Sequence, residues 1–230
     1  MIGVRLLVLA LVLVPAAVAG GDSPGPVTAN LDNDPELERV VPQDVCQTLK
    51  GNLRAAPPAC TENEFLRHRI AIEDSCSGGQ PLQTSISGVQ DTVDRLRVTE
   101  ADGKTKRPEI FFDMRSGATG RGGEIRLVRY SPPARIACHG ARVHRLFRYP
   151  SRATLGRIPR GAVGHDSFSA LLGDYEKRYA GKEIRVIETY VDHDDAFCCP
   201  SFRRITNFRF SRARDEYVRY RSRVGRLKKR

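Results

Sequence analysis

Several features are missing from this chain of 230 residues, and each absence argues against a class of protein. Beyond the first 19 residues, no apolar run approaches the ~20 residues that are needed to cross a bilayer. The spacings Cys-x-x-Cys and His-x-x-x-His are absent, which argues against a zinc site and a catalytic dithiol. No phosphate-binding loop and no nucleophile elbow is found, so we predict no catalytic residue, cofactor or metal.

The first 19 residues have the pattern of a secretory signal peptide. Arg5 provides the positive start, residues 6–14 form a short apolar run, and the small residues up to Ala19 suit a signal peptidase. The first cysteine, Cys46, lies far beyond the expected cleavage after Ala19, so lipid attachment at that point is not expected. We therefore expect an exported protein that is secreted or resides in the cell envelope.

The composition of the remaining chain suggests one domain with flexible ends. Arginine outnumbers lysine 31 to 7, a bias that is typical of a GC-rich bacterial genome. The predicted organisation is a signal peptide over residues 1–19, a flexible leader over 20–40, a single β-rich domain over 41–224 and a basic tail over 225–230.

Alternation of apolar and polar residues predicts a mainly β, antiparallel fold with one short helix near the N-terminus. The helix is expected over residues 44–54, where Val45, Leu49 and Leu53 recur at four-residue spacing. Residues 168–179 fit a helical face as well as a strand followed by a turn, and the hairpin repeat described next favours the strand. Strands are predicted over residues 65–72, 93–99, 110–114, 125–130, 142–149, 203–211 and 217–224.

A short repeat supports the hairpin interpretation. The pair Glu-Ile begins a hydrophobic run at Glu109, Glu124 and Glu183, and acidic turns at Asp102 and Asp174 precede two of these runs. The unit resembles the hairpins of FG-GAP or VCBS-type extracellular repeats, in which an acidic turn often holds calcium. Residues 103–106 read Gly-Lys-Thr-Lys where further oxygen ligands are needed, so we expect the hairpin without the metal.

The six cysteines are expected to form disulfides in an oxidising compartment. Adjacent residues of an extended strand point to opposite faces, so Cys198 and Cys199 can each tie the strand to a different layer, with Cys138 as the best partner for one of them. The pairing of the others stays open, because six cysteines allow fifteen pairings. The disulfide candidates are Cys46, Cys60, Cys76, Cys138, Cys198 and Cys199. A zinc site that combines the last three with His139 and His193 is the less favoured alternative.

The segment around the paired cysteines carries a second resemblance. The run Cys198-Cys199-Pro200-Ser201, followed by a polar and aromatic strand, resembles the C-terminal part of actinobacterial exported proteins of the LppP/LprE lipoprotein type, over residues 183–224. This resemblance implies an actinobacterial envelope protein whose biochemistry is unassigned, and it transfers no catalytic residue. The acylation cysteine of those lipoproteins has no counterpart here, so membrane tethering does not carry over.

Positive charge is concentrated at the C-terminal end. Residues 201–230 contain twelve Lys and Arg against two Asp and Glu, a net charge of +10 out of +11 for the whole chain. With simple alternation, Arg219, Arg221 and Arg223 share one strand face and form an anion-binding candidate, because guanidinium groups pair with phosphate bidentately. The expected partner is an anionic cell-wall polymer or a membrane surface, and not nucleic acid. The alternative is a solvated sheet face.

The function that best fits these features is that of a non-catalytic, exported binding or structural protein, expected to be a monomer. His165-Asp166-Ser167 contains the residue types of a catalytic triad, but three neighbours along one strand cannot converge as triad members do. A cell-envelope hydrolase with an unrecognised site remains the alternative. A pocket that joins His139, His144 or His193 with two carboxylates would favour it.

Overall fold

A computed structural model describes the backbone of most of the chain. It describes residues 24–32, 34, 36–56, 59–76, 80–103, 107–116, 122–132, 141–151, 154, 157–175, 181–193 and 200–227. All of its regular elements are β-strands, so the predicted β-rich, antiparallel class is confirmed for this part of the chain. The strands are β1 (Val27–Ala29), β2 (Glu38–Thr48), β3 (Leu53–Ala55), β4 (Glu64–Cys76), β5 (Gln80–Ser85), β6 (Thr92–Thr99), β7 (Glu109–Ser116), β8 (Gly122–Ser131), β9 (Arg142–Tyr149), β10 (Gly164–Gly173), β11 (Glu183–Val191), β12 (Phe202–Ser211) and β13 (Glu216–Arg226).

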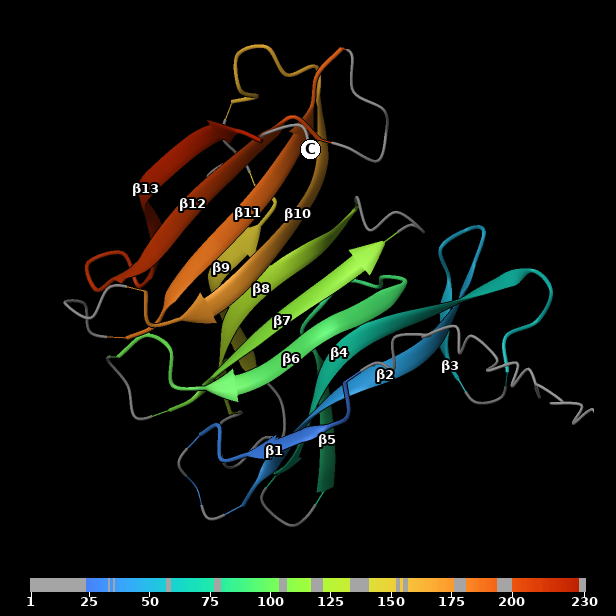
Figure 1. The fold of residues 1–230 in the computed structure, drawn as a ribbon. Coiled ribbons are helices and arrows are strands. Elements are labelled where there is room, and N and C mark those ends of the chain that lie inside the picture. Colours follow the sequence, from blue (N-terminus) through green and yellow to red (C-terminus); the bar gives the residue numbers. More distant parts are fainter. Residues whose placement is uncertain are drawn as a thin grey trace, which may run out of the picture.

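The strands form three antiparallel sheets that are stacked in chain order (Figure 1). Sheet A has the order β1-β2-β4-β5, with β3 paired to β2, sheet B has β6-β7-β8-β9, and sheet C has β10-β11-β12-β13. In sheets B and C every strand pairs with its neighbour in sequence, which short turns allow in antiparallel sheets. Sheet B is the middle layer, with sheet A on one side and sheet C on the other.

The predicted helix over residues 44–54 is wrong. Its first half belongs to β2 and its end to β3, which pair with each other over three residues, as at Cys46 and Arg54. Leu49 and Leu53, expected on a buried helix face, are 79% and 47% exposed. Pairing of β2 with β4 over ten residues outweighs the local four-residue periodicity, as tertiary context often does.

The other strand predictions are confirmed, and the hairpin repeat has a structural basis. The strand alternative for residues 168–179 holds up to Gly173, the last residue of β10. Glu109 and Glu183 each begin the second strand of a four-stranded sheet, and both are buried. Glu124, by contrast, lies in the third strand of sheet B, so this third Glu-Ile pair occupies a different place in the fold.

The ends of the domain differ from the predicted boundaries. Within the expected leader, residues 27–29 form β1, and Leu31 and Val40 are fully buried in the core between sheets A and B. At the other end, β13 continues to Arg226, inside the expected tail. The predicted signal peptide over residues 1–19 lies outside the described residues.

Two hydrophobic cores lie on the two faces of sheet B. Alternating residues of β7 serve both cores, because Phe111 packs toward sheet C whereas Ile110 and Phe112 pack toward sheet A. Edge-to-face aromatic pairs join sheets B and C, with ring centroids 5.0 Å apart for Phe147 and Phe208. This double burial explains why successive residues of β7, from Glu109 to Arg115, are all buried, whichever face they point to.

A buried polar cluster also joins sheets B and C. The Glu188 carboxylate accepts two hydrogen bonds from Arg204, each of 2.5 Å, and one each from the hydroxyls of Tyr149 and Tyr190. Burial alone would raise the pKa of Glu188, but these donors outweigh it and hold the pKa below its ordinary value. Arg204 also donates to the carbonyl of Arg157 at 2.6 Å.

A second buried pair gives a pH-dependent contribution to stability. Asp113 Oδ2 accepts a hydrogen bond of 2.7 Å from Arg115, whereas the buried Oδ1 has no hydrogen-bond partner. Burial raises the pKa of Asp113 to about 6 despite the charge of Arg115, from an ordinary value of 3.8. The folded state therefore binds this proton more tightly, and the contribution of Asp113 to stability falls as the pH rises through this window.

We expect Asp113→Asn to reveal this proton. The unfolding free energy of the variant minus that of the unchanged protein should rise by about 1–3 kcal/mol from pH 4 to pH 7. The reason is that the unchanged protein loses the contribution of the Asp113 proton over this range, whereas the amide does not titrate. Urea unfolding at both pH values measures the change. The exposed Glu100→Gln serves as control and should show no such gain. An equal offset of Asp113→Asn at both pH values would contradict the assignment.

Candidate anion-binding face

The outer surface of sheet C carries a group of arginines from three strands. Ile184 and Val186 of β11 point into the core, so Arg185 between them faces outward. The register then places three more guanidinium-bearing residues on the same face. We name this set the arginine face, and it consists of Arg185, Arg203, Arg221 and Arg223.

The predicted ladder of Arg219, Arg221 and Arg223 is interrupted. β13 pairs Arg221 with Asn207 and Arg219 with Phe208, so Tyr220 is an extra residue that forms a β-bulge. Opposed residues of antiparallel strands share a face, and Asn207 and Phe208 lie on opposite faces. Arg221 and Arg223 therefore stay together on the outer face, whereas Arg219, although exposed, lies on the face of Phe208.

The arginine face has little internal charge compensation. Arg203, Arg221 and Arg223 are exposed, and within the described part of the chain Arg203 and Arg223 make no ion pair. Two carboxylates of the described residues lie at this surface. Glu183 is 1% exposed, and Asp166 accepts a hydrogen bond of 2.9 Å from Thr189 at the far end of β11.

Two contacts hold the side chain of Arg185. Its Nε donates a hydrogen bond of 3.1 Å to Oδ1 of Asn207, and its guanidinium lies 3.9 Å from the ring centre of Tyr175. Stacking of this kind keeps the guanidinium charged and oriented. Since Asn207 pairs with both Arg185 and Arg221, it lies between two positive side chains of neighbouring strands.

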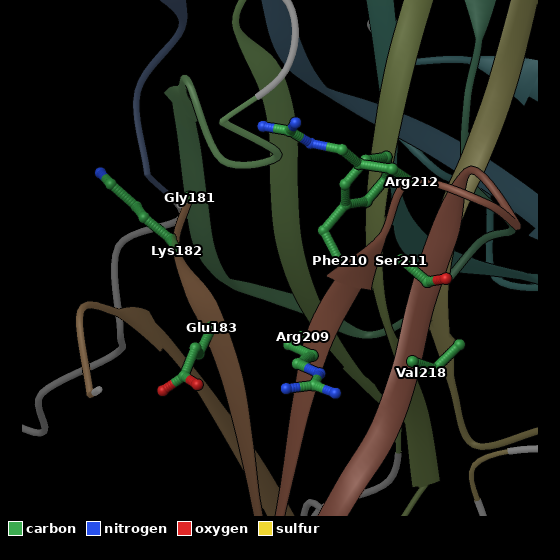
Figure 2. A pocket seen from close by; sticks show the side chains of 8 residues that line it. All are labelled: Gly181, Lys182, Glu183, Arg209, Phe210, Ser211, Arg212 and Val218. Atoms are coloured by element: carbon green, nitrogen blue, oxygen red, sulfur yellow. The ribbon is translucent and has the colours of Figure 1, made fainter. Parts of the chain in front are cut away.

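A pocket of about 320 Å³ adjoins the arginine face at the end of β12. Figure 2 shows its side chains, which come from the start of β11, from the end of β12 with the following turn, and from β13. Its lining residues are Gly181, Lys182, Glu183, Arg209, Phe210, Ser211, Arg212 and Val218. Three of them are cations and one is an anion, so the pocket continues the positive character of the face.

Only one of the two carboxylate oxygens of Glu183, the acid in this pocket, has a hydrogen-bond partner among the described residues. Glu183 Oε1 accepts a hydrogen bond of 2.6 Å from Tyr220, the bulged residue of β13, while Oε2 is buried without a partner. The guanidinium of Arg209 lies 5.4 Å from the Tyr220 ring centre. The bulge therefore splits the predicted ladder and also places an aromatic ring between a buried acid and an arginine.

The cysteines are only partly described. Cys46 and Cys60 form a disulfide, with Cα atoms 5.4 Å apart. Cys76 ends β4, and the predicted partners Cys138, Cys198 and Cys199 lie outside the described residues, as does His139. The pairing of Cys138 with Cys198 or Cys199 and the alternative zinc site therefore stay predictions.

Two other histidines, His144 and His68, each lie close to an aspartate. His144 lies 3.1 Å from Asp215, and His68 lies 2.8 Å from Asp44. His193 is exposed in the turn after β11. No histidine lines either of the two described pockets, the second of which is lined by residues of β2, β4 and β5 and by the end of β3.

The residues that resembled a catalytic triad are engaged in pairing between strands. The hydroxyl of Ser167 lies 2.8 Å from that of Thr189, which also donates to Asp166. A register shift between His165 and Ser167 marks a bulge at this point of β10. These contacts join β10 to β11 and account for the polar character of the segment.

Comparison of the chain with known protein families, with curated protein sequences and with solved structures finds no match. None of the described residues forms a helix that is long and apolar enough to span a membrane. The function therefore has to be inferred from the residues of the site.

Sequence reasoning found two of the four members of the arginine face and missed the other two. Arg185 and Arg203 alternate with buried residues in their own strands, as the burial patterns of β11 and β12 show. That alternation was the available signal. The register that brings them beside Arg221 and Arg223 depends on pairing between strands and is not encoded locally.

Proposed function

We propose that this protein is an exported, non-catalytic binding or structural protein that contacts an anionic polymer of the bacterial cell envelope through the arginine face. The observation that carries the proposal is the placement of Arg203 and Arg223, which are exposed and make no ion pair with the described residues, beside Arg185 and Arg221. Guanidinium groups bind phosphate and carboxylate in bidentate fashion, so such a surface favours repeated anionic groups.

Other features support the setting of this proposal. The N-terminal sequence has the pattern of a signal peptide, and the disulfide between Cys46 and Cys60 suits an oxidising compartment. The resemblance of residues 183–224 to LppP/LprE-type exported proteins covers most of β11, β12 and β13, the strands that carry the arginine face. We favour a polymer over a lipid surface because the apolar residues that share this face, Ile187 and Ile205, are only partly exposed and are therefore poor anchors for a bilayer.

The geometry suits an extended ligand. Residues two apart in a strand, such as Arg221 and Arg223, lie about 6.7 Å apart, and neighbouring strands lie about 4.8 Å apart. One flexible polyanion can therefore contact several guanidinium groups together. The adjoining pocket offers a further contact point at the end of β12, with Arg209 in the strand and Arg212 directly after it.

We expect the triple variant Arg203→Ser, Arg221→Ser and Arg223→Ser to bind a poly(glycerol phosphate) teichoic acid about 10–100-fold more weakly, since each surface cation contributes up to about 1 kcal/mol. Titration at low salt measures the affinity. Binding of the unchanged protein should also weaken as salt rises from about 0.05 to 0.5 M, because exposed charges are screened.

The matched control is Arg142→Ser, Arg145→Ser and Arg148→Ser in β9, which removes the same charge from exposed positions on another sheet. Arg219→Ser provides a second control on β13 itself, because Arg219 lies on the opposite face. Equal loss of affinity in the β9 triple variant would show that only net charge matters and would reject the proposed face. Tighter binding to phosphatidylglycerol vesicles than to the polymer would instead assign the surface to lipid.

A further inference from the structure

A group of carboxylates at the entry to sheet A lies far from the arginine face in sequence. Asp32, Asp34 and Glu38 each offer a carboxylate oxygen, and the three oxygens lie within 4.8 Å of one another. They are contributed by the connection from β1 to β2 and by the first residue of β2. Two oxygens that bind the same Ca²⁺ can be separated by at most about 4.8 Å, twice the usual Ca–O distance, so these oxygens are close enough to share one ion.

Glu38 supplies an independent observation. Its side chain is 0% exposed, Oε2 accepts a hydrogen bond from the backbone N–H of Leu31, and Oε1 is buried without a hydrogen-bond partner. A buried carboxylate oxygen without a partner is costly unless a proton or a cation satisfies it. The unpartnered oxygen belongs to the same carboxylate that stands beside Asp32 and Asp34.

The charges around Glu38 make the site more negative. Burial, and after it the negative charges of Asp32, Asp74 and Asp34, raise the pKa of Glu38 to about 7. Asp74 comes from β4, and its Oδ2 accepts a hydrogen bond of 2.5 Å from the hydroxyl of Tyr130 in β8. Carboxylates from sheet A thus gather at the boundary with sheet B.

Backbone contacts hold the ligand set in place. Asp32 Oδ1 accepts from the N–H of Asp34 at 3.0 Å, and Asp34 Oδ1 accepts from the N–H of Glu36 at 2.8 Å. Each of the three carboxylates therefore uses one oxygen for the backbone and has a second oxygen for another partner. Oxygen donors also recur at alternate positions of the sequence, at Asn30, Asp32, Asp34, Glu36 and Glu38, as in loops that bind calcium.

We propose that Asp32, Asp34 and Glu38 form a Ca²⁺ site that ties the N-terminal segment to the boundary between sheets A and B, with Asp74 as a nearby negative charge. This site goes beyond the anion-binding function and departs from our expectation of no metal. Calcium fits better than zinc because all the donors are oxygens. It fits better than magnesium because several protein carboxylates can enter its larger coordination shell, whereas magnesium demands near-octahedral geometry and usually keeps several waters. A site of this kind in an extracellular module binds with a Kd of about 0.1–1 mM.

The first test is thermal unfolding of the mature protein after treatment with a chelator. We expect 10 mM Ca²⁺ to raise the Tm by about 3–8 °C, because an ion that binds only the folded state stabilises it. Glu38→Gln should abolish this rise. In the chelator alone, the same variant should melt at or above the Tm of the unchanged protein, because it removes a buried negative charge.

Asp34→Asn tests the same site at a partly exposed position, where the substitution should not impair folding. It should reduce the rise of the Tm that Ca²⁺ produces. Glu100→Gln, an exposed change outside the ligand set, should keep the full response. An unchanged Tm of the starting protein together with no saturable Ca²⁺ binding by calorimetry would overturn the proposal. A full response in Glu38→Gln or Asp34→Asn would overturn it as well.

Terbium provides a test of location. The chain has no tryptophan, so energy transfer to a bound Tb³⁺ must come from tyrosine. Tyr130 is the tyrosine whose hydroxyl donates a hydrogen bond to Asp74, the negative charge beside the proposed site. We expect sensitised emission that Ca²⁺ competes away. Tyr130→Phe should lower this emission while the Ca²⁺ response of the Tm remains. Undiminished emission in Tyr130→Phe would place the ion elsewhere and reject this site.

Discussion

Replacement of Arg204 by methionine should cost about 3–5 kcal/mol of unfolding free energy, because it leaves the carboxylate of Glu188 buried without its cation. The side chains of Arg204 and Glu188 are 5% and 1% exposed, and two hydrogen bonds of 2.5 Å join them. Tyr149 and Tyr190 donate to the same carboxylate, but a neutral hydroxyl does not compensate its charge. Urea unfolding at pH 7 measures the loss.

The neighbouring residue offers a matched control for this substitution. Arg203 precedes Arg204 in β12 and faces outward, so Arg203→Met should change stability by less than about 0.5 kcal/mol. Addition of Glu188→Gln to Arg204→Met should recover part of the loss, because the carboxylate that lacks a counterion is then neutral. If Arg204→Met cost less than 1 kcal/mol, the cluster would not join sheets B and C as inferred.

This cluster illustrates what the sequence could not predict. Glu188 and Arg204 lie on adjacent strands, and each follows the alternation of its own strand as a charged residue at a buried position. Reading by polarity alone assigns such residues to the solvent face. Only the stacking of sheet C on sheet B, with Tyr149 contributed by β9, shows that they satisfy one another.

The strands themselves were accessible to sequence reasoning, because period-two alternation is a local signal. The same local logic failed at residues 44–54, where Val45 and Leu49 have helical spacing but the chain forms two paired strands. It failed again at Arg219, because a single bulged residue, Tyr220, reverses the alternation of β13. A bulge changes which face each later residue occupies, and sequence periodicity alone gives no sign of it.

The N-terminal boundary was missed for a related reason. The stretch that includes Asn30, Asp32 and Asp34 is rich in residues that favour turns, which suggested a flexible leader. The same residues are oxygen donors, and the apolar Leu31 among them is fully buried. A polar segment can therefore be ordered when its side chains converge, and the proposed Ca²⁺ site gives such convergence a physical basis.

Loss of the disulfide between Cys46 and Cys60 should have the second large effect. The two cysteines are separated by 14 residues in sequence, and closing a loop of that size contributes about 3 kcal/mol by restricting the unfolded chain. The loop contains β3 and ends just before β4. We expect the double variant Cys46→Ser and Cys60→Ser to lose about 2–3 kcal/mol of unfolding free energy in urea.

The location of the loss can be tested as well as its size. The tip formed by β2, β3 and β4 exposes Leu49, Leu53, Phe65 and Leu66, which are 79%, 47%, 49% and 52% exposed. With little core of its own, this tip should open before the three-sheet body does, so hydrogen exchange in the double variant should rise first in β3 and at the end of β2.

Glu64→Gln is the comparison, because it removes the ion pair of Glu64 with Arg54 in the same tip but leaves the covalent bond. Its effect should be much smaller, since a partly exposed ion pair restricts the unfolded chain far less than a disulfide does. Uniformly faster exchange across all three sheets in the double variant would instead mean that the bond supports the fold as a whole.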